Sequence, residues 1–195
     1  MPFRNKLSGF TLFELMVTIS MIVLLLTMSS VAFRNTNKRT ELIFTAHQVA
    51  AMARLAESYA ASAKELDNIA SQNIWGLYFD KTDNQKIIMF VDVDNNQLFE
   101  PALDKVVRTL TLPRQIIVWK IFEGQGLNEQ EITAPNGAVA VLFSPPDPKT
   151  KLRYFPDISN NWDSTEVVRV TLKDDNNESV KNIKFNFFGL IDVPQ

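Results

Sequence analysis

An unbroken apolar stretch near the amino terminus is the strongest feature of the hydrophobic pattern along the chain. Residues 10–33 contain no Arg, Lys, Asp or His, and Glu14 is their only charged residue. A helix of about 24 residues is long enough to cross the roughly 30 Å hydrocarbon core of a bilayer. The sequence therefore predicts a transmembrane helix over residues 10–33, after a leader, residues 1–9, that carries Arg4 and Lys6.

A helical period continues beyond the apolar stretch. Apolar residues recur at alternating steps of four and three, and most of them are Ala: Leu42, Ala46, Val49, Ala53, Ala56, Ala60 and Ala63. This spacing marks one face of a helix, and small residues along it allow close approach to a sheet, whereas a free coiled coil more often shows Leu or Ile. We expect residues 34–71 to extend the same helix to about Ala70, with a local break at residues 34–38, where Asn and Thr are weak helix formers.

The period changes to that of β-strands in residues 72–195. Runs rich in β-branched and aromatic residues predict about seven or eight strands, mostly antiparallel. Five runs cover residues 73–80, 86–94, 106–112, 116–122 and 138–144. Two more lie between residues 165 and 193, one before and one after Asp-Asp-Asn-Asn. Residues 123–137 and 144–164 are expected to be long surface loops. The predicted fold class is α+β, with a long amino-terminal helix packed against an antiparallel β-rich domain.

Composition removes several classes of function. The chain of 195 residues has a net charge of −2, no Cys and one His, His47. These counts exclude disulfides, thiol catalysis and Cys-based zinc sites, and they argue against a His-dependent triad. The sequence also lacks Gly-x-Ser-x-Gly, a phosphate-binding glycine loop and His-Glu-x-x-His. No enzyme activity, no cofactor and no nucleic-acid partner is expected, and His47 is interpreted as a helix-surface or packing residue.

An acidic stretch at residues 90–100, "FVDVDNNQLFE", superficially resembles a calcium loop. Asp92, Asp94 and Asn96 occupy alternate positions. The EF-hand template requires Gly at its sixth position and Glu at its twelfth, where this chain has Gln97 and Leu103. The template therefore fails, and a β-hairpin turn with acidic ends is the simpler interpretation. Asp92, Asp94 and Asn96 remain the calcium candidates of the sequence.

Glu14 helps to distinguish between the possible interpretations of the amino-terminal apolar segment. An ordinary secretory signal has a shorter apolar region and a small-x-small cleavage site, and a simple signal anchor explains the length of the run but not Gly9, Phe10 and Glu14 together. An ionised carboxylate at the bilayer centre costs about 2.5–3.5 kcal/mol on insertion scales. Glu14 therefore either has a partner or lies near the interface, protonated or reaching toward water.

The stretch "SGFTLFELMVTISMIVLLL", residues 8–26, resembles the class III signal of type IV pilins and type II secretion pseudopilins. That family pattern is a short basic leader, then Gly-Phe, then Thr-Leu-x-Glu at the head of a hydrophobic helix. The matching residues here are Gly9, Phe10, Thr11, Leu12 and Glu14. The resemblance implies cleavage by prepilin peptidase between Gly9 and Phe10, N-methylation of Phe10, and pairing of Glu14 with the amino terminus of a neighbouring subunit.

Within that family, the layout most resembles minor pseudopilins of the GspH/FimT type, which often have a Trp-Gly-Leu strand and a Gly in the final strand. Their counterparts here are Gly76, within "WGLYF", and Gly189. The chain departs from DNA-binding members because Asp192, and no basic residue, follows Gly189. It also lacks the paired-Cys loop of many major pilins.

The resemblance implies a minor structural subunit of a type II secretion pseudopilus or a type IV pilus, with the alternative of a pilus-tip binding module for adhesion, DNA uptake or recognition of a secreted substrate. The implied partners are prepilin peptidase, other pilin or pseudopilin subunits and the inner-membrane assembly platform. The implied location is the inner membrane, crossed once with the amino terminus in the cytoplasm and the carboxyl-terminal domain outside it, and then the filament.

Overall fold

The structure is a computed structural model of the chain. It describes residues 10–64, 73–124, 129–132, 138–144, 149–155, 167–175, 179–186 and 189–194, with the backbone alone at residues 30–37 and 149–155. The chain divides into two compact units, Met1–Thr40 and Glu41–Gln195.

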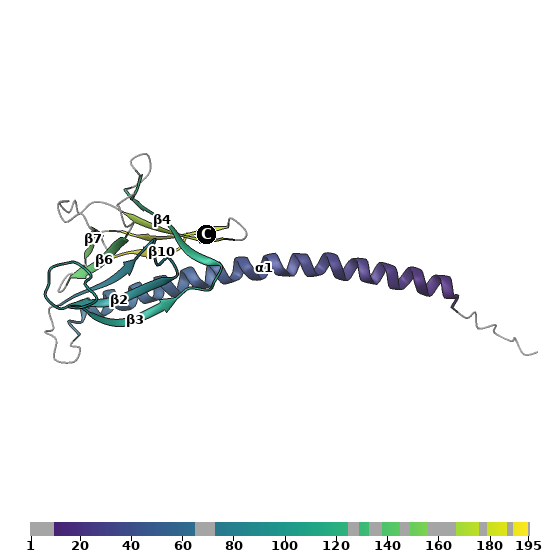
Figure 1. Cartoon of the computed structure of the whole chain (residues 1–195), viewed down its shortest axis with the longest axis horizontal. Coiled ribbons are helices and arrows are strands. Elements are labelled where there is room, and N and C mark those ends of the chain that lie inside the picture. Colours follow the sequence, from purple (N-terminus) through teal and green to yellow (C-terminus); the bar gives the residue numbers. More distant parts are fainter. Residues whose placement is uncertain are drawn as a thin grey trace, which may run out of the picture. The chain divides into compact units, whose positions relative to one another are not determined.

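One helix, α1, spans Leu12–Ala61 and passes through residues 34–38 without the predicted break (Figure 1). It ends about nine residues earlier than the period predicts, because a C-terminal cap stops it. Ala63 has a φ of 48°, in the left-handed region. The N–H of Lys64 bonds to the carbonyl of Tyr59 at 3.0 Å, and the N–H of Ala63 bonds to that of Ala60 at 3.1 Å. This is a Schellman cap with Ala at the position that usually holds Gly.

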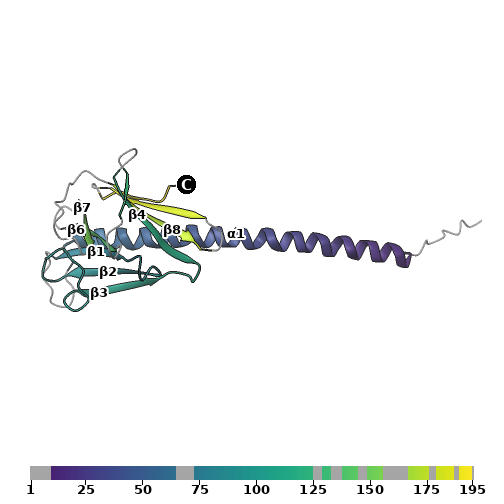
Figure 2. The ribbon, with the colours of Figure 1, turned by 45° about the horizontal axis from the view of Figure 1, so that its top comes forward.

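Two five-stranded antiparallel sheets follow α1 (Figure 2). Every strand pair in the described residues is antiparallel, as predicted. The first sheet has the order β3 (Lys105–Thr111), β2 (Lys86–Asp92), β1 (Ile74–Phe79), β6 (Ala138–Ser144) and β7 (Lys149–Phe155). The second has the order β10 (Ile191–Asp192), β9 (Val180–Phe185), β8 (Val168–Asp174), β4 (Ile116–Glu123) and β5 (Gln130–Glu131). The chain is therefore an α+β protein with an apolar amino-terminal helix.

The prediction of two long surface loops is partly wrong. Strand β7 lies within residues 144–164 and pairs with β6 along its whole length, and the short β5 lies within residues 123–137 and pairs with β4. The segment that forms β7, "KTKLRYF", carries three basic residues and comes directly after "PPDP", which contains three prolines. Strand β7 forms because its backbone can pair with the free edge of β6. The sequence of β7 alone carries little signal for a strand.

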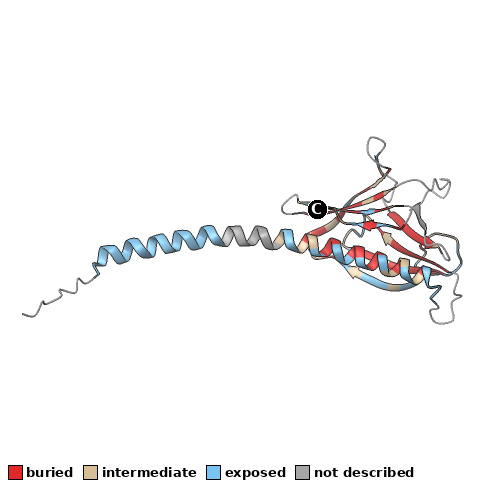
Figure 3. Cartoon of the chain, turned by 180° about the vertical axis from the view of Figure 1, so that it is seen from behind, coloured by how far each residue is buried: buried red, intermediate tan, exposed pale blue. Residues whose placement is uncertain are grey.

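The apolar face of α1 was predicted correctly as far as the helix extends. Ala46, Val49, Ala53, Ala56 and Ala60 are each 0% exposed, and Leu42 is also buried (Figure 3). They share one core with residues of both sheets. Ala63 lies beyond the end of the helix and is exposed, so it does not belong to this face. His47 is exposed, as expected of a helix-surface residue.

Further contacts fix the second half of α1 in the core of the β unit. The ring of Tyr59 lies edge-on to that of Trp75 with centroids 4.9 Å apart. Arg54 donates a hydrogen bond to the carbonyl of Ile191 at 2.8 Å, and the side chain of Gln115 donates one to Glu41. The helix is thus joined to β1 and to the final strand as well as packed against them.

The central strands of the first sheet, β2, β1 and β6, are buried on both faces. Alternate residues of β1 and β2 enter the core shared with α1, and the residues between them form a second, smaller core. Phe99, in the loop between β2 and β3, contributes to this second core, with its ring centroid 4.7 Å from those of Phe90 and Tyr78. Gly76 keeps this core close-packed, because a Cβ there would lie 2.7–2.8 Å from Leu142 and Phe90. The β2–β3 loop therefore covers the face of the sheet turned away from the helix.

Candidate functional site

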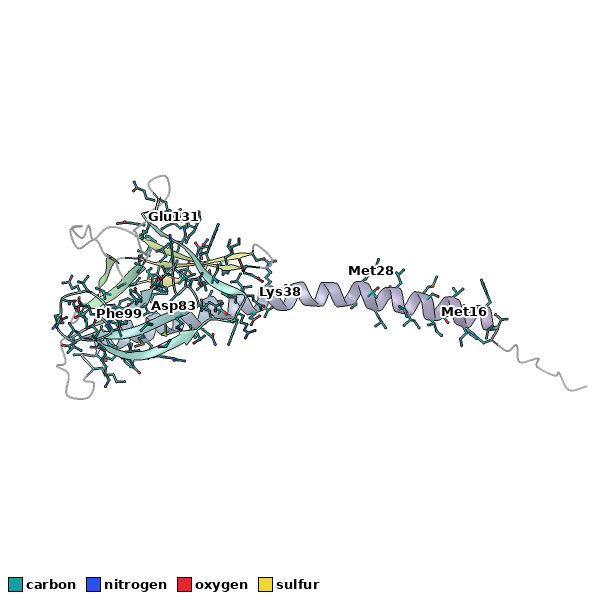
Figure 4. The ribbon with its side chains drawn as sticks, in the orientation of Figure 1. Met16, Met28, Lys38, Asp83, Phe99 and Glu131 are labelled. Carbon is teal, nitrogen blue, oxygen red and sulfur yellow. The ribbon has the colours of Figure 1, made fainter. Side chains whose placement is uncertain are left out.

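Two places carry the residues that the sequence singles out: the start of α1 and the loop between β2 and β3. At the start of α1, Leu12–Ser29 is long and apolar enough to cross a membrane, and none of it is buried within the structure. The side chains of this segment, Met16 and Met28 among them, project freely from the ribbon (Figure 4). Its apolar surface has no cover within its own unit.

Three hydroxyl groups of the apolar segment satisfy their hydrogen bonds locally, whereas the one carboxylate does not. The hydroxyl groups of Thr18, Ser20 and Thr27 each donate to a backbone carbonyl three or four residues earlier, at 2.6–2.9 Å. Such bonds allow Ser and Thr to enter a membrane helix at little cost. The carboxylate of Glu14 forms no hydrogen bond or ion pair among the described residues, so it is the polar group of this segment that requires a partner from elsewhere.

Glu14 also occupies a helix-capping position. Its backbone N–H donates to the hydroxyl of Thr11 at 3.2 Å, and α1 begins at Leu12. Thr11 is thus the N-cap and Glu14 the third residue of the helix. This is the Thr-x-x-Glu pattern of a capping box, of which the structure forms only the bond to the Thr11 hydroxyl. The sequence contained this signal, which the interpretation of Glu14 as an assembly residue did not use. Phe10 and Glu14 are both exposed, and Gly9 lies outside the described residues.

The second place is an acidic cluster made of Asp92, Asp94 and Asp104. Asp92 is the last residue of β2, and Asp104 directly precedes β3. Their oxygens and that of Asp94 all lie within 4.8 Å of one another. Asp92 and Asp94 are two of the calcium candidates from the sequence. Asp104 was missed, although β2 and β3 form an antiparallel pair in which Val91 faces Lys105, so that the next residues outward, Asp92 and Asp104, face one another.

The loop from residue 93 to residue 103 is held by hydrogen bonds to these carboxylates. Asp104 accepts the backbone N–H groups of Val93 at 3.1 Å and Glu100 at 2.7 Å. Asp92 Oδ2 accepts the N–H of Gln97 at 2.7 Å. Gln97 has a φ of 65°. The acidic side chains therefore replace the backbone partners that a tight hairpin would supply, and they allow this longer loop to fold over the sheet.

Asn96 supports the loop but does not belong to the group of three carboxylates. Its backbone N–H and its side-chain amide both donate to Asp94, at 3.2 and 2.9 Å, and the amide also donates to Glu100 at 2.7 Å. The side-chain oxygen of Asn96, Oδ1, accepts the backbone N–H of Leu98 at 2.7 Å. Asn96 thus orients Asp94.

Burial and mutual repulsion act together on the acidic cluster. The pKa of Asp92 is raised to about 7. Burial is the largest cause, the neighbouring carboxylates of Asp94 and Asp104 contribute to the rise, and the N–H of Gln97 opposes it. Burial likewise raises the pKa of Asp104, against the lowering effect of the two N–H groups that it accepts. Asp92 is 0% exposed, and its Oδ1 has no hydrogen-bond partner in the described part of the chain. The carboxylates are therefore held together against their electrostatic preference.

A third feature is a row of aromatic and basic side chains on β4 and β8. Trp119 is 41% exposed and lies beside Lys120 and Lys173, and the guanidinium of Arg169 lies 4.0 Å from the centroid of Phe122. Two of these cations are neutralised, because Lys120 pairs with Glu131 at 2.8 Å and Arg169 pairs with Glu129 at 2.6 Å. This row is a surface with apolar rings and little net positive charge.

Comparison with known proteins adds no assignment to these sites: no family model matches the chain, and no curated protein and no solved structure is significantly similar to it.

Proposed function

We propose that the protein is a minor pilin-like subunit that is assembled into a type II secretion pseudopilus or a type IV pilus through its amino-terminal helix. The observation that carries the proposal is the combination of the Gly9-Phe10 motif with the unpaired carboxylate of Glu14 in an uncovered apolar helix. A helix of this kind needs a membrane before assembly and other helices after it. No enzyme activity is proposed.

Cleavage between Gly9 and Phe10 would explain why the motif has these residues at these positions. A small residue at position 9 allows the backbone to enter a tight protease cleft. Cutting before the apolar segment retains the membrane helix and creates a new amine at Phe10. The proposed orientation places the amino terminus in the cytoplasm and the β unit outside the inner membrane. The partners are prepilin peptidase, the inner-membrane assembly platform and other pilin-like subunits.

The new amine of a neighbouring subunit is the proposed partner of Glu14. An ammonium and a carboxylate attract strongly at low dielectric, although the cost of removing both from water offsets much of the gain. An unpaired Glu14 is penalised in the packed filament and a paired one is not, so the pair selects one axial stagger between subunits. Thr18, Ser20 and Thr27 cannot serve in this way, because their hydroxyl groups already bond to their own helix.

Glu14→Gln tests the proposal and separates it from helix capping. Gln also serves at the third position of a capping box, so this variant retains the cap and loses only the charge. We expect it to insert into the membrane and be cleaved, but to enter filaments at a level reduced by about tenfold or more, as for loss of a buried ion pair. Immunoblots of membrane and sheared-filament fractions measure both pools.

Thr11→Ala is the matched control, because it removes the capping hydroxyl and leaves the charge of Glu14. It should enter filaments nearly as well as the wild type. Equal losses in Thr11→Ala and Glu14→Gln would show that the cap matters and the charge does not. Normal incorporation of Glu14→Gln would leave Glu14 as a carboxylate at the membrane interface, without an assembly role.

Gly9→Leu tests the processing step. A Leu side chain does not fit a cleft that accepts only a small residue, so the variant should remain uncleaved when it is co-expressed with a prepilin peptidase. Intact mass spectrometry identifies the first residue of the product and any methyl group on it. A wild-type product that begins at a residue other than Phe10, or unchanged cleavage of Gly9→Leu, would refute this step.

The tip-module alternative is favoured by one observation, the exposed ring of Trp119 within the row on β4 and β8. Exposed aromatic residues are enriched where proteins bind partners. The same row argues against nucleic acid, because Glu129 and Glu131 neutralise Arg169 and Lys120, and tight binding to phosphates requires clustered free cations. Trp119→Ala should leave filament assembly unchanged and reduce binding of a secreted protein or a surface, and salt-sensitive DNA binding would contradict the exclusion of nucleic acid.

A further inference from the structure

The acidic cluster of Asp92, Asp94 and Asp104 has no part in the proposed filament function. Three carboxylates whose oxygens lie within 4.8 Å of one another repel each other unless a proton or a cation lies among them. Proximity of acidic groups alone does not define a site, since such groups are common at the ends of hairpins. The question is whether the cluster holds a buried group that has no partner among the described residues.

Asp92 is such a group. Its side chain is 0% exposed, and its Oδ1 has no hydrogen-bond partner among the described residues, which include the whole β2–β3 loop. Its Oδ2 accepts the N–H of Gln97 at 2.7 Å, which fixes the carboxylate in place. An unsatisfied buried polar atom costs about 1–3 kcal/mol, and more when it is charged. This oxygen belongs to the deepest carboxylate of the cluster, so a ligand held by the three residues would supply its missing partner.

We infer that Asp92, Asp94 and Asp104 form a binding site for a divalent cation, and that the cation is Ca²⁺. All the donors are oxygens, which hard cations prefer over the nitrogen and sulfur ligands of transition metals. Two oxygens on opposite sides of Ca²⁺ lie about 4.6–5.2 Å apart, against about 4.0–4.2 Å for Mg²⁺. Separations of up to 4.8 Å therefore suit Ca²⁺. Asp94 is exposed, so water reaches the site and can complete the coordination shell.

The cation would fasten the loop that covers the second core. Asp92 and Asp104 stand at the two ends of the loop, and Phe99 lies between them against Phe90 and Tyr78. Neutralising the carboxylates holds the ends of the loop together and thereby keeps Phe99 in place. Calcium binding should therefore stabilise the fold, whether or not the protein forms filaments.

The experiment uses the full chain in detergent, stripped of metal with EGTA. Isothermal titration with CaCl₂ should give one site with a Kd on the order of 0.1–1 mM, the range of extracytoplasmic calcium modules. The melting temperature should rise with CaCl₂ and rise less with MgCl₂. Asp94→Asn is the principal variant, because its exposed side chain can change without disturbing the core, and it should weaken binding by about tenfold or more. Asp92→Asn should abolish binding.

Asp83→Asn is the matched control. Asp83 is an acidic residue before the start of β2, at the opposite end of that strand from Asp92, and it pairs only with Lys86 at the surface (2.8 Å). This variant should bind Ca²⁺ as the wild type does. The inference is overturned if the wild type gives no calcium heat up to about 10 mM, a concentration above the weakest Kd of such modules. It is also overturned if Asp94→Asn binds as tightly as the wild type, if Asp83→Asn loses as much, or if Mg²⁺ binds equally well.

Discussion

At the scale of single residues, the charge of Asp92 decides how the β2–β3 loop behaves. The residue ends a strand that is buried on both faces, and its carboxylate is closed off from water. The alternating acids at Asp92 and Asp94 were visible in the sequence. Their third partner, Asp104, was not, because only the pairing of β2 with β3 brings residues twelve positions apart together. The burial of one oxygen without a partner is likewise a property of the folded loop, which no pattern of residue types reveals.

The first prediction is that the metal-free protein loses stability as the pH rises from about 4 to about 7. In the unfolded chain Asp92 titrates near its ordinary value of about 4. In the folded chain its pKa is raised to about 7, mainly by burial, with Asp94 and Asp104 as its acidic neighbours. The unfolded state therefore releases the proton first, and the contribution of Asp92 to stability is full below about pH 4 and lost as the pH passes through about 7.

The measurement compares the wild type with Asp92→Asn in EGTA. Other groups titrate in the same range, so only the difference between the two proteins reports on Asp92. The free energy of unfolding of the wild type should fall relative to that of the variant by on the order of 3 kcal/mol across this range. The variant should therefore be most stable relative to the wild type at about pH 8, and added Ca²⁺ should offset this gain. A difference that is independent of pH would contradict the raised pKa.

At the scale of elements, the face of the helix that is buried followed from periodicity. The order of the strands in the two sheets and the ends of the elements did not. The steps of four and three from Leu42 to Ala60 identified the buried face, because a helix repeats every 3.6 residues. The end of α1 was missed because its cap uses Ala63 in place of Gly, so the sequence shows no stop signal. Strand β7 was missed because the edge of β6 specifies it more strongly than its own residues do.

The second prediction is that Ala63→Gly stabilises the protein. Ala63 holds a φ of 48°, where its Cβ crowds the backbone and where Gly is free of that cost. The Schellman hydrogen bonds use only backbone atoms, and the side chain is exposed, so nothing else is lost. The gain should be about 0.5–1 kcal/mol, after allowance for the greater freedom of Gly in the unfolded chain.

Thermal or urea unfolding followed by tryptophan fluorescence measures this gain. Ala61→Gly is the control, because Ala61 is the last residue of α1 and is also exposed, but it has no positive φ. Gly in a helical position should destabilise the protein by up to about 1 kcal/mol. Loss of stability in both variants would show that the cap does not hold the left-handed conformation in solution.

At the scale of the whole molecule, the second half of α1 is a core element of the β unit. The boundary between the two units falls between Thr40 and Glu41, within the helix. Beyond it, both sheets place residues in the core that they share with α1. The sequence predicted this packing from the small residues on the helix face. It did not predict that the unit would also bury the opposite face of its first sheet under the β2–β3 loop.

The third prediction is that the fragment 36–195 folds and the fragment 62–195 does not. The longer fragment retains the complete second unit and one further turn of helix. The shorter one loses every helix residue of the core, and burial of Leu42, Val49 and Met52 alone contributes about 5–9 kcal/mol. That loss equals most of the 5–15 kcal/mol that typically separates folded from unfolded domains. Removal of the helix would also expose the inner faces of both sheets.

Circular dichroism and thermal melting of the two purified fragments test this directly. The fragment 36–195 should melt in one cooperative transition, and calcium should raise its melting temperature as is expected for the full chain. The fragment 62–195 should aggregate or show no cooperative transition, and a synthetic peptide of residues 36–64 should restore one, because it returns the missing face of the core. A cooperative transition in 62–195 at a similar temperature would show that α1 only lies against a β domain that folds without it.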